Sequence, residues 1–383
     1  MRDPQGRKMD EIGVGLIGTG FMGKAHALAY RSARAVMGDC PGARLALLCD
    51  APEEKARAMA AQFGFARWTA DWRALVADPE VALVSIATPN RLHREIALAA
   101  LGAGKPVWCE KPLALTLAEA REMAEAARRS GLPTMVGYNY LRNPAFGHAR
   151  RLIAAGAIGR VTQFRGWVDE DYQADAALPW TWRARREEAG LGALGDIGVH
   201  LASMACGLLG PIESLVAEVQ TVHETRALPR GGRAPVENED CAAALVRFES
   251  GVPGTLNVSR AAWGRKNRLD WEVHGTEGML CFQQERMNEL QLYRNEGDPA
   301  TAGFRTILTG PAHPPYDRFV PAPGHQLGFL DLKTIEAAEI LRAVAGGDAP
   351  HPDFDDALHF ETVVHAMDAS ARDGRRVRVA EMS

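Results

Sequence analysis

The sequence predicts an α/β protein: a doubly wound parallel sheet at the N-terminus, followed by an α+β domain with a large, open, mostly antiparallel sheet. Up to about residue 140, short apolar runs alternate with helical patterns, as in successive βαβ units. Beyond that point, longer strand-like runs follow one another with glycine-containing turns between them, which is typical of antiparallel strands. This change of pattern indicates two domains, at 9–139 and 140–383.

Bulk composition limits the classes of protein to consider. Of the 383 residues, 46% are hydrophobic and 24% are charged, which suits a globular protein with two sizeable cores. The formal net charge of −4 gives no reason to expect a nucleic-acid or membrane partner. The six cysteines are dispersed, without a CxxC pair or metal-ligand spacing, so we expect reduced thiols and no bound metal. With a polar N-terminus and no apolar run near the roughly 20 residues that span a bilayer, the chain is expected in the cytoplasm.

The N-terminal elements are predicted from their hydrophobic periodicity. Strands are predicted at 12–17, 45–50, 82–87, 106–109 and 133–137, with amphipathic helices between them, for example at 92–104 and 117–130. In the helix at 117–130, Ala120, Met123, Ala124 and Ala127 recur at the spacing of one helical face. Because the strands alternate with helices, their carboxyl ends should meet at one edge of the sheet, where ligands bind in such folds.

A glycine pattern opens the first helix. Gly18, Gly20 and Gly23 stand in GxGxxG spacing directly after the first strand, with Phe21 and Met22 in the same turn. In that setting the glycines permit a tight turn, a close approach to a pyrophosphate and packing of the helix on the strand. The helix N-terminus adds amide donors for an anion. Glycines also serve ordinary turns, but this context favours a dinucleotide-binding Rossmann domain, with all five residues at the cofactor.

The next two strand ends extend this cofactor site. Asp50 ends the second strand, where a carboxylate accepts the adenosine ribose hydroxyls and repels a 2′-phosphate, so NAD is favoured over NADP. Asp50 could also cap the following helix. The turn after the third strand contains Thr88, Pro89 and Asn90, followed by His93, and we expect these residues to reach the nicotinamide ribose. A plain turn, and for His93 a packing role, remain open as alternatives.

Two charged residues follow the apolar strand at 106–109. Glu110 and Lys111 precede Pro112, which ends the strand and presents Lys111 to the cleft in which the nicotinamide should lie. Buried lysines are rare, so a functional role is favoured over a structural salt bridge. Glu110 is expected at the cofactor site, paired with a backbone amide or a helix start.

The second half predicts a sheet with helices around it. A helix is predicted at 146–155, and the two closing helices at 327–345 and 354–372. Strand-like runs lie at 157–168, 215–221, 240–248, 254–261, 268–274 and 279–283. The Pro/Gly-rich stretch at 309–324 is long enough to suggest a functional or interface loop.

A second group of polar residues lies at the start of a helix in this half. Asp196 and His200 are four residues apart, so they share one face of an α-helix, and Gly190, Gly192 and Gly195 precede or flank them. A lone histidine on an apolar face is usually a packed core residue, but an Asp-x-x-x-His pair behind a glycine-rich loop indicates a site. Metal binding is the weaker chemical interpretation, because no third ligand stands at matching spacing.

These stretches together resemble the glucose–fructose oxidoreductase/inositol dehydrogenase family, Gfo/Idh/MocA. The resemblance rests on "GLIGTGFMGKAH", "SIATPNRLH", "CEKPLALT", "GYNYLRNPA" and "GALGDIGVHLAS", which occur in the family's order over nearly the whole chain. It implies an NAD-binding Rossmann domain at 9–139 and a substrate-binding domain at 140–383, whose open sheet forms a homodimer or homotetramer interface. The family's catalytic Lys, Asp and His correspond to Lys111, Asp196 and His200. One departure is Ser203, where many members carry an aspartate.

The resemblance implies an NAD-dependent dehydrogenase that oxidises a secondary hydroxyl of a cyclic sugar or cyclitol. His200 is the expected base, oriented by Asp196, while Lys111 donates a hydrogen bond to the reacting oxygen. The reverse assignment, with Lys111 as the base, stays open. Tyr140, Glu170 and Tyr172 are expected at the substrate, together with the three catalytic residues. Residues expected to complete the cofactor site are Asn139, Trp182 and Arg183.

The substrate is narrowed by two further stretches. "WTWRARREEAGLGALGD" and "TGPAHP" are most similar to family members that act on levoglucosan or scyllo-inositol. Levoglucosan, oxidised at C3, is therefore the first expected substrate, with inositols and glucose next. Two other functions remain open: a lyase or glycosidase-like enzyme that recycles bound NAD, and a non-catalytic dinucleotide-sensing protein.

Overall fold

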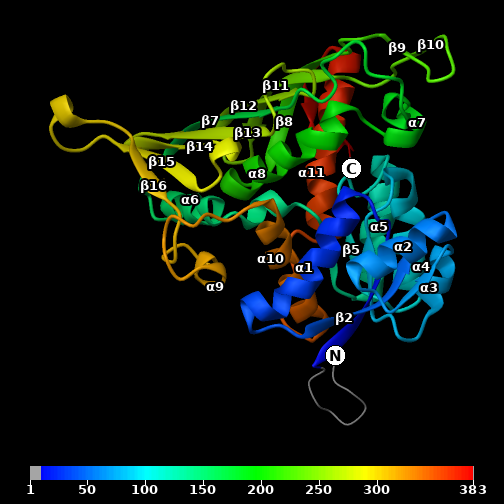
Figure 1. The fold of residues 1–383 in the computed structure, drawn as a ribbon. Helices are drawn as coiled ribbons and strands as arrows, with labels where there is room; N and C mark the ends of the chain where they lie inside the picture. The colour runs from blue at the N-terminus through cyan, green and yellow to red at the C-terminus, as the bar shows by residue number, and fades with distance from the viewer. Residues whose placement is uncertain (1–9, 383) are drawn as a thin grey trace. The chain divides into compact units, whose positions relative to one another are not determined.

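The computed structural model describes residues 10–382, so residue 9, at which the predicted first domain starts, lies outside it. The chain forms two compact units, whose course Figure 1 follows by colour. One unit contains the described residues up to Arg142 together with Leu327–Leu358. The other contains Asn143–Gln326 and the residues from His359 onward.

The first unit is built on a parallel sheet of six strands in the order β3-β2-β1-β4-β5-β6. The strands are β1 (Glu11–Ile17), β2 (Gly42–Cys49), β3 (Arg67–Thr69), β4 (Leu83–Ile86), β5 (Val107–Cys109) and β6 (Thr134–Val136). β1, β4, β5 and β6 carry almost only buried residues, as expected for strands covered on both faces. The strand order reverses between β1 and β4, and ligands of such folds bind beyond the carboxyl ends of the strands at that point. The predicted doubly wound parallel sheet is confirmed.

The helices of this unit are α1 (Phe21–Met37), α2 (Glu53–Phe63), α3 (Trp72–Ala77), α4 (His93–Gly102), α5 (Leu117–Ser130) and α10 (Phe329–Val344). Three of them, α4, α5 and α10, begin and end close to the predicted positions. The predicted bounds of α5 are confirmed, because Thr116 and Glu119 form a capping box at its start and Gly131 ends it in a left-handed conformation.

Helix α10 comes from the far end of the sequence but packs beside α1 in the first unit. Sequence analysis placed this segment in the second domain. Phe329 stacks on Phe21 with ring centroids 5.4 Å apart, and Arg342 pairs with Asp39 at 3.1 Å. The C-terminal part of the chain therefore contributes side chains to the first unit.

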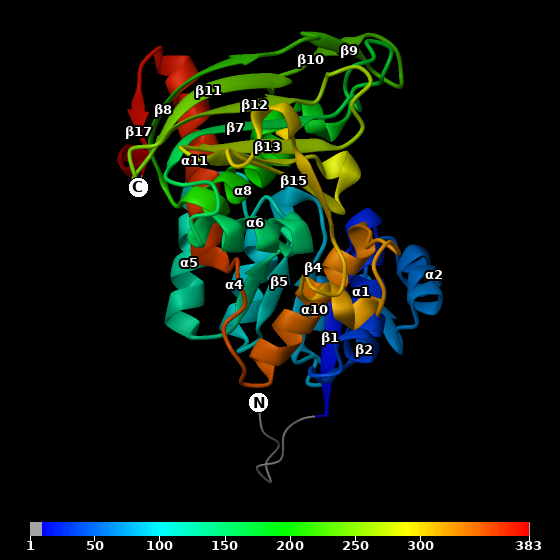
Figure 2. The ribbon, with the colours of Figure 1, turned by 90° about the vertical axis from the view of Figure 1, so that its left-hand side faces the viewer.

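The second unit is built on a mixed sheet of nine strands in the order β16-β15-β14-β13-β7-β12-β11-β8-β17, most of which run across the upper part of Figure 2. All neighbouring strands are antiparallel except β7 and β12. Their bounds are β7 (Val161–Asp169), β8 (Ile212–Gln220), β11 (Cys241–Phe248), β12 (Pro253–Ser259), β13 (Arg268–Gly275), β14 (Gly278–Phe282), β15 (Glu289–Arg294), β16 (Arg305–Leu308) and β17 (Val377–Arg378). A separate hairpin joins β9 (Thr225–Ala227) and β10 (Arg233–Pro235). The predicted mostly antiparallel sheet is confirmed.

Helices cover one face of this sheet. The helices of the unit are α6 (Pro144–Ala154), α7 (Arg186–Ala189), α8 (Val199–Leu209), α9 (Tyr316–Phe319) and most of α11 (Phe354–Asp373). In β11 the buried residues alternate with exposed ones, so Val246 faces the core while Leu245 is 57% exposed on the other face. The core contains Phe164, Phe248 and Trp271, which contact one another or their neighbours edge-on or stacked.

One stretch, Arg186–Leu209, is long and apolar enough to cross a membrane by length and composition. It contains α7, the π-helix η4 (Leu194–Gly198) and α8. Of its most apolar window, 83% is buried inside the protein. This is the pattern of a core helix, since a helix that is apolar on all sides needs packing partners on all sides.

Candidate active site

The glycine turn between β1 and α1 fits a dinucleotide pyrophosphate. Gly18 has a φ of +97°, and a Cβ atom there would lie 2.3 Å from the carbonyl oxygen of Ala87. A Cβ atom on Gly23 would lie 2.1 Å from the carbonyl oxygen of Gly18. Beside Gly20, by contrast, no described atom beyond its chain neighbours lies within 4 Å of the Cβ position. The first turn of α1 has neither an acidic residue nor a side-chain cap, so its amides suit an anionic ligand.

Two buried polar atoms near the same sheet edge fit a polar ligand as well. Thr88 follows β4, and Asn139 opens η2 (Asn139–Arg142) after β6. Within residues 10–382, Thr88 Oγ1 and Asn139 Nδ2 have no hydrogen-bond partner. An unsatisfied buried polar group costs about 1–3 kcal/mol. Both residues were predicted at the cofactor, and a nicotinamide ribose or amide would supply the missing partners.

Asp50 lies directly after β2 and is held from several sides. The Thr19 amide donates to its Oδ2 at 2.9 Å, the Thr19 hydroxyl donates to the same atom, and the Ala51 amide donates to Oδ1 at 2.7 Å. Lys55 pairs with Oδ2 at 2.9 Å through a side chain that is 48% exposed. Burial raises the pKa of Asp50, but the hydrogen bonds from Lys55, Thr19 and Ala51 outweigh it and keep the pKa below its ordinary value. The carboxylate is thus ionised and fixed, as a ribose acceptor requires.

His93 connects two loops at the carboxyl edge of the sheet. Its Nδ1 lies 2.8 Å from the carbonyl oxygen of Pro112, and its Nε2 lies 3.0 Å from that of Thr88. Burial lowers the pKa of His93 more than these carbonyls raise it, so the ring is neutral and its single N–H donates to one of the two carbonyls. The ring fixes the turn after β4 against the segment after β5.

Glu110 is the centre of a buried ionic cluster. Its Oε1 accepts a hydrogen bond from Lys333 Nζ at 2.6 Å and lies 2.8 Å from His26 Nε2. Lys333 also pairs with Glu336 at 2.8 Å, and both side chains are fully buried. The predicted pairing of Glu110 with a backbone amide or a helix start is wrong: the partners are two side chains, from α1 and α10. We call Glu110, His26, Lys333 and Glu336 the Glu110 cluster.

The charges of the Glu110 cluster follow from its contacts. Burial raises the pKa of Glu110, but Lys333 and His26 outweigh it and hold the pKa well below its ordinary range. Burial lowers the pKa of His26, which lies parallel to the Trp108 ring with centroids 3.7 Å apart. For Glu336, burial outweighs the attraction of Lys333 and raises the pKa to about 7. At neutral pH the cluster therefore contains a negative Glu110, a positive Lys333 and a neutral His26, with Glu336 close to its titration point.

Lys111 directly follows Glu110 at the carboxyl end of β5 and is half-buried. On its other side, the carbonyl oxygen of Pro112 lies 2.8 Å from His93 Nδ1. Lys111 thus stands between two immobilised neighbours, at the edge where the cofactor features described above converge. The two charged residues after this buried strand therefore have different environments. The charge of Glu110 is balanced by the buried Lys333, whereas Lys111 lies at the edge of the sheet.

Asp196 and His200 lie in the second unit, where a π-helix precedes α8. Asp196 belongs to η4 (Leu194–Gly198) and His200 to α8, so the four-residue spacing is not that of an uninterrupted α-helix. The Tyr172 hydroxyl donates to Asp196 Oδ2 at 2.6 Å, and burial raises the pKa of Tyr172 well above its ordinary value. His200 is buried, and its carbonyl accepts a hydrogen bond from Ser203 Oγ at 2.8 Å.

The turn before η4 is held by Glu239. The Glu239 carbonyl accepts the Ala193 amide at 2.9 Å, and its side chain accepts the Leu194 amide at 2.9 Å. A Cβ atom on Gly192 would lie 2.1 Å from the Glu239 carbonyl oxygen, which explains the glycine. Burial raises the pKa of Glu239. Next to it, Asp240 and Arg260 form a buried ion pair at 2.7 Å.

The remaining predicted residues are distributed over both units. In the first unit, Tyr140 packs edge-on against Phe329 at 6.2 Å, and Phe21 is 71% exposed. In the second unit, the Arg183 guanidinium lies over the Trp182 ring at 4.4 Å. The Glu170 amide and carbonyl extend the pairing of β7 towards residues 259–262. The roles assigned to these residues remain predictions.

Sequence analysis did not identify Lys333, Glu336 or Glu239. The sequence does contain a signal for Lys333 and Glu336. They stand three residues apart on α10, next to the apolar residues Leu332, Ile335 and Ala337. Charges at that spacing are usually an exposed pair, and their burial depends on α10 packing beside α1, which no local pattern reveals.

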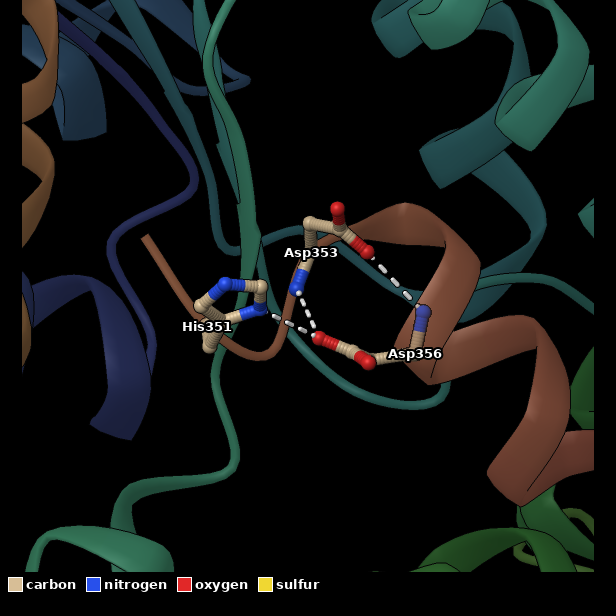
Figure 3. A group of neighbouring side chains, drawn as sticks. All are labelled: His351, Asp353 and Asp356. Atoms are coloured by element: carbon tan, nitrogen blue, oxygen red, sulfur yellow. Dashed lines mark hydrogen bonds and ion pairs between the residues drawn. The ribbon is translucent and has the colours of Figure 1, made fainter. Parts of the chain in front are cut away.

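One further group of ligand-type side chains comprises His351, Asp353 and Asp356, shown in Figure 3. Asp353 Oδ1 accepts the amides of Asp355 and Asp356 at 2.9 Å each, and Asp356 Oδ2 accepts the Asp353 amide at 3.1 Å. Asp356 also binds His351 Nδ1 at 2.9 Å. These contacts are those of a helix cap at the start of α11, which accounts for the group without a metal ion.

Comparisons with known proteins agree with both units. Residues 12–138 match the family described as "Oxidoreductase family, NAD-binding Rossmann fold", and residues 146–281 match the "GFO/IDH/MocA C-terminal domain". The predicted NAD-binding Rossmann domain is thereby confirmed.

Two relatives and one solved structure illustrate the likeness. Levoglucosan dehydrogenase of Pseudarthrobacter phenanthrenivorans is 39% identical over 389 residues, covering 98% of this chain and 100% of the relative. D-apiose dehydrogenase of Paraburkholderia graminis is 30% identical over 371 residues, covering 96% of this chain and 89% of the relative. A structure of levoglucosan dehydrogenase in complex with NADH and levoglucosan matches with a TM-score of 0.92 and 40% identity, covering 96% of this chain and 99% of that one.

Proposed function

Because this chain belongs to the Gfo/Idh/MocA family of oxidoreductases, we propose that it is an NAD-dependent dehydrogenase that oxidises levoglucosan at C3. The observation that carries the proposal is the likeness over 98% of the chain to a levoglucosan dehydrogenase, together with the fold shared with a levoglucosan dehydrogenase in complex with NADH and levoglucosan. The relatives reported above are dehydrogenases, so a lyase that recycles its NAD and a non-catalytic sensor are not favoured.

The proposed chemistry uses three side chains. When bound, NAD⁺ accepts a hydride from the carbon that carries the reacting hydroxyl. His200 takes the hydroxyl proton as general base, and Lys111 donates a hydrogen bond that favours the alkoxide. Asp196 orients the imidazole of His200. The hydrogen bond from Tyr172 to Asp196 supports this role, because it stabilises the ionised carboxylate on which orientation of an imidazolium depends.

Neutral sugars are the proposed substrate class. Recognition of a phosphate or a carboxylate typically uses a bidentate arginine. Arg142 is already paired with Glu339 at 2.5 Å, and Arg183 stacks on Trp182. Both arginines thus already have contacts within the chain. Levoglucosan, inositols and glucose should accordingly be better substrates than sugar phosphates or uronic acids.

NAD, rather than NADP, is the proposed working cofactor. Asp50 is ionised and lies directly after β2, so it would repel a 2′-phosphate. Steady-state kinetics with both cofactors test this: kcat/KM should be higher with NAD⁺, and Asp50→Ser should narrow the difference. An equal or higher kcat/KM with NADP⁺ would contradict the assignment.

The decisive experiment for the reaction is a substrate screen with product identification. NADH formation is measured with levoglucosan, scyllo-inositol, myo-inositol, glucose and glucose 6-phosphate at matched concentrations, and products are identified by NMR. The expected result is the highest kcat/KM with levoglucosan and a 3-keto product. Oxidation at a primary alcohol, or a sugar phosphate as the best substrate, would refute the proposal. Purified enzyme with bound NAD and no net NADH formation would favour the recycling lyase.

We also propose that the second unit binds substrate and assembles the enzyme as a homodimer or homotetramer in the cytoplasm. The six free cysteines suit a reducing compartment. The face of β11, β12 and β13 opposite the helices includes the exposed Leu245, and covering such a face is favourable where it is apolar. Light scattering at micromolar concentration should give a dimer or a tetramer, and a stable monomer would contradict the assembly.

A further inference from the structure

Helix α10 places a positive charge in the core of the nucleotide-binding unit. Lys333 is fully buried, with Nζ 2.6 Å from Glu110 and 2.8 Å from Glu336. The same Nζ lies 5.4 Å from the centre of the Trp108 ring. Transfer of such charges out of water costs several kcal/mol per ion, and well-packed apolar residues of similar volume would be equally stable or more so. Stability alone therefore does not account for the Glu110 cluster.

The cluster fixes Glu110 from several elements at once. His26 holds the carboxylate from α1, Lys333 holds it from α10, and the Glu110 amide donates to the Ile86 carbonyl of β4 at 2.9 Å. Gly137 also packs closely against the Glu110 carboxylate, because an added Cβ atom at Gly137 would lie 2.4 Å from Glu110 Oε1. The carboxylate has little room to shift, so the peptide that joins Glu110 to Lys111 is fixed as well.

We propose that Lys333 is a positioning residue for Lys111, acting through Glu110. The inference rests on the proposed function, in which Lys111 contacts the reacting oxygen. A buried ion pair imposes one distance and one direction on Glu110, whereas apolar packing tolerates several. The His93 Nδ1 atom lies 2.8 Å from the Pro112 carbonyl oxygen, so the backbone of Lys111 has a contact on its other side as well. The C-terminal helix α10 would thereby determine where the catalytic ammonium lies.

The test compares Lys333→Met with Arg342→Met. Arg342 is the matched control, because it also joins α10 to the residues after α1, through a partly exposed pair with Asp39 remote from Lys111. Activity is measured with levoglucosan and NAD⁺ at a temperature at which circular dichroism shows both variants folded. For Lys333→Met, kcat should fall about 10- to 100-fold, the scale expected for a displaced catalytic group. KM for the sugar and Kd for NADH, measured by fluorescence, should change less than about threefold, which is a small effect on binding. A kcat within twofold of wild type would overturn the proposal.

A double variant separates positioning from stability. Lys333→Met leaves Glu110 with one partner fewer, so the variant is expected to lose thermal stability. Glu110→Gln combined with Lys333→Met removes both charges and should regain much of the melting temperature, while kcat stays low. Recovery of kcat together with the melting temperature would overturn the proposal. If neither variant folds, Glu110→Gln alone decides, since it keeps the side-chain volume: a tenfold lower kcat supports positioning, and an unchanged kcat refutes it.

Lys111→Met, measured in parallel, distinguishes this inference from the proposed function. A normal kcat in Lys111→Met refutes the catalytic role of Lys111 and with it the positioning role of Lys333. An inactive Lys111→Met beside a normal Lys333→Met refutes the positioning role alone. Low kcat in both variants, with cofactor binding retained, supports both.

Discussion

The segments that present Lys111 and Asp196 are fixed by different kinds of contact. Next to Lys111, the anchors are buried charges: Glu110 lies between His26 and Lys333. Before Asp196, the anchors are backbone amides that donate to Glu239, and Asp196 itself accepts a neutral hydroxyl. One segment follows a strand of a parallel sheet, and the other enters a π-helix behind a glycine-rich turn.

The difference has an energetic consequence. Removing one partner of a buried ion pair leaves an uncompensated charge, whereas removing the charge of a hydrogen-bond acceptor leaves a polar atom that still accepts. The region around Glu110 should therefore be the more sensitive to charge-changing substitutions. The region around Glu239 should tolerate an amide in place of the carboxyl.

The largest expected effect tests this contrast through the free energy of unfolding. Lys333→Met should lower it by about 3–5 kcal/mol, the usual cost of breaking a buried pair. Glu239→Gln should lower it by at most about 1 kcal/mol, because the amide oxygen still accepts from the Leu194 amide. Urea titrations of both variants and of Arg342→Met give the values. If both variants lose the same free energy of unfolding, the buried ion pair at Glu110 is no more sensitive to substitution than the hydrogen bonds at Glu239.

The next effect concerns turnover and should be alike in both regions. Lys111→Met and His200→Ala should each lower kcat by about 10²-fold or more, the scale of a general acid–base group. Asp196→Asn should also be damaging, through loss of His200 orientation. NADH binding, followed by fluorescence, should persist because Gly18, Gly20 and Asp50 are unchanged. Lys266→Met, which breaks an exposed pair with Asp171, is the control and should keep normal turnover. Normal kcat in one of the three site variants would remove that residue from the proposed mechanism.

Local patterns in the sequence predicted the first region well. The parallel strands, the glycine turn and α5 follow from periodicity, GxGxxG spacing and a Thr–Glu capping box, all of which are local signals. Most strands of the large sheet were predicted too. β15, β16 and β17 were not, because "ELQLYR", "RTIL" and "VR" are short and their strand conformation depends on pairing with β14, β15 and β8 rather than on their own pattern.

The anchors of the candidate site were much less predictable. Lys333 lies 223 positions from Glu110 along the chain, and only the packing of α10 beside α1 brings the two together. The π-helix at Asp196 arises from a turn held by Glu239, 45 positions away from Leu194. Residues that contact a ligand stand in recognisable motifs, whereas the residues that hold those motifs in place are determined by tertiary contacts.

Because of Glu336, a member of the Glu110 cluster, the free energy of unfolding should depend on pH. Its pKa is raised from 4.5 to about 7 in the folded protein. Between those values the unfolded chain has lost the proton while the folded protein keeps it, so the free energy of unfolding falls as pH rises and levels off above 7. The fall should be at most about 3 kcal/mol, since each pKa unit corresponds to about 1.4 kcal/mol and the shift is shared with Lys333 and Glu110.

The variant Glu336→Gln should lack this component. Urea midpoints measured from pH 5 to pH 8 should decline for wild type and decline less for Glu336→Gln. Glu122→Gln serves as control, because Glu122 forms an exposed pair with Arg94. If the urea midpoints of wild type and Glu336→Gln change with pH in parallel, the pKa of Glu336 is not raised. The charges assigned above to the Glu110 cluster would then be wrong.

The smallest effect on stability is expected for the solvent-exposed ion pair between Lys55 and Asp50 in the first unit. Lys55 pairs with Asp50 at 2.9 Å, but its side chain is 48% exposed, and such pairs contribute about 0–1 kcal/mol. Lys55→Met should leave the urea midpoint nearly unchanged, in contrast to Lys333→Met. It should also increase the preference for NAD⁺ over NADP⁺ by less than about fivefold, because it removes a cation that could attract a 2′-phosphate beside Asp50. The ratio of kcat/KM values for the two cofactors measures this. A stability loss as large as that of Lys333→Met would show that burial does not account for the different contributions of the two ion pairs. A reversal of the cofactor preference would show that Lys55, rather than Asp50, determines that preference.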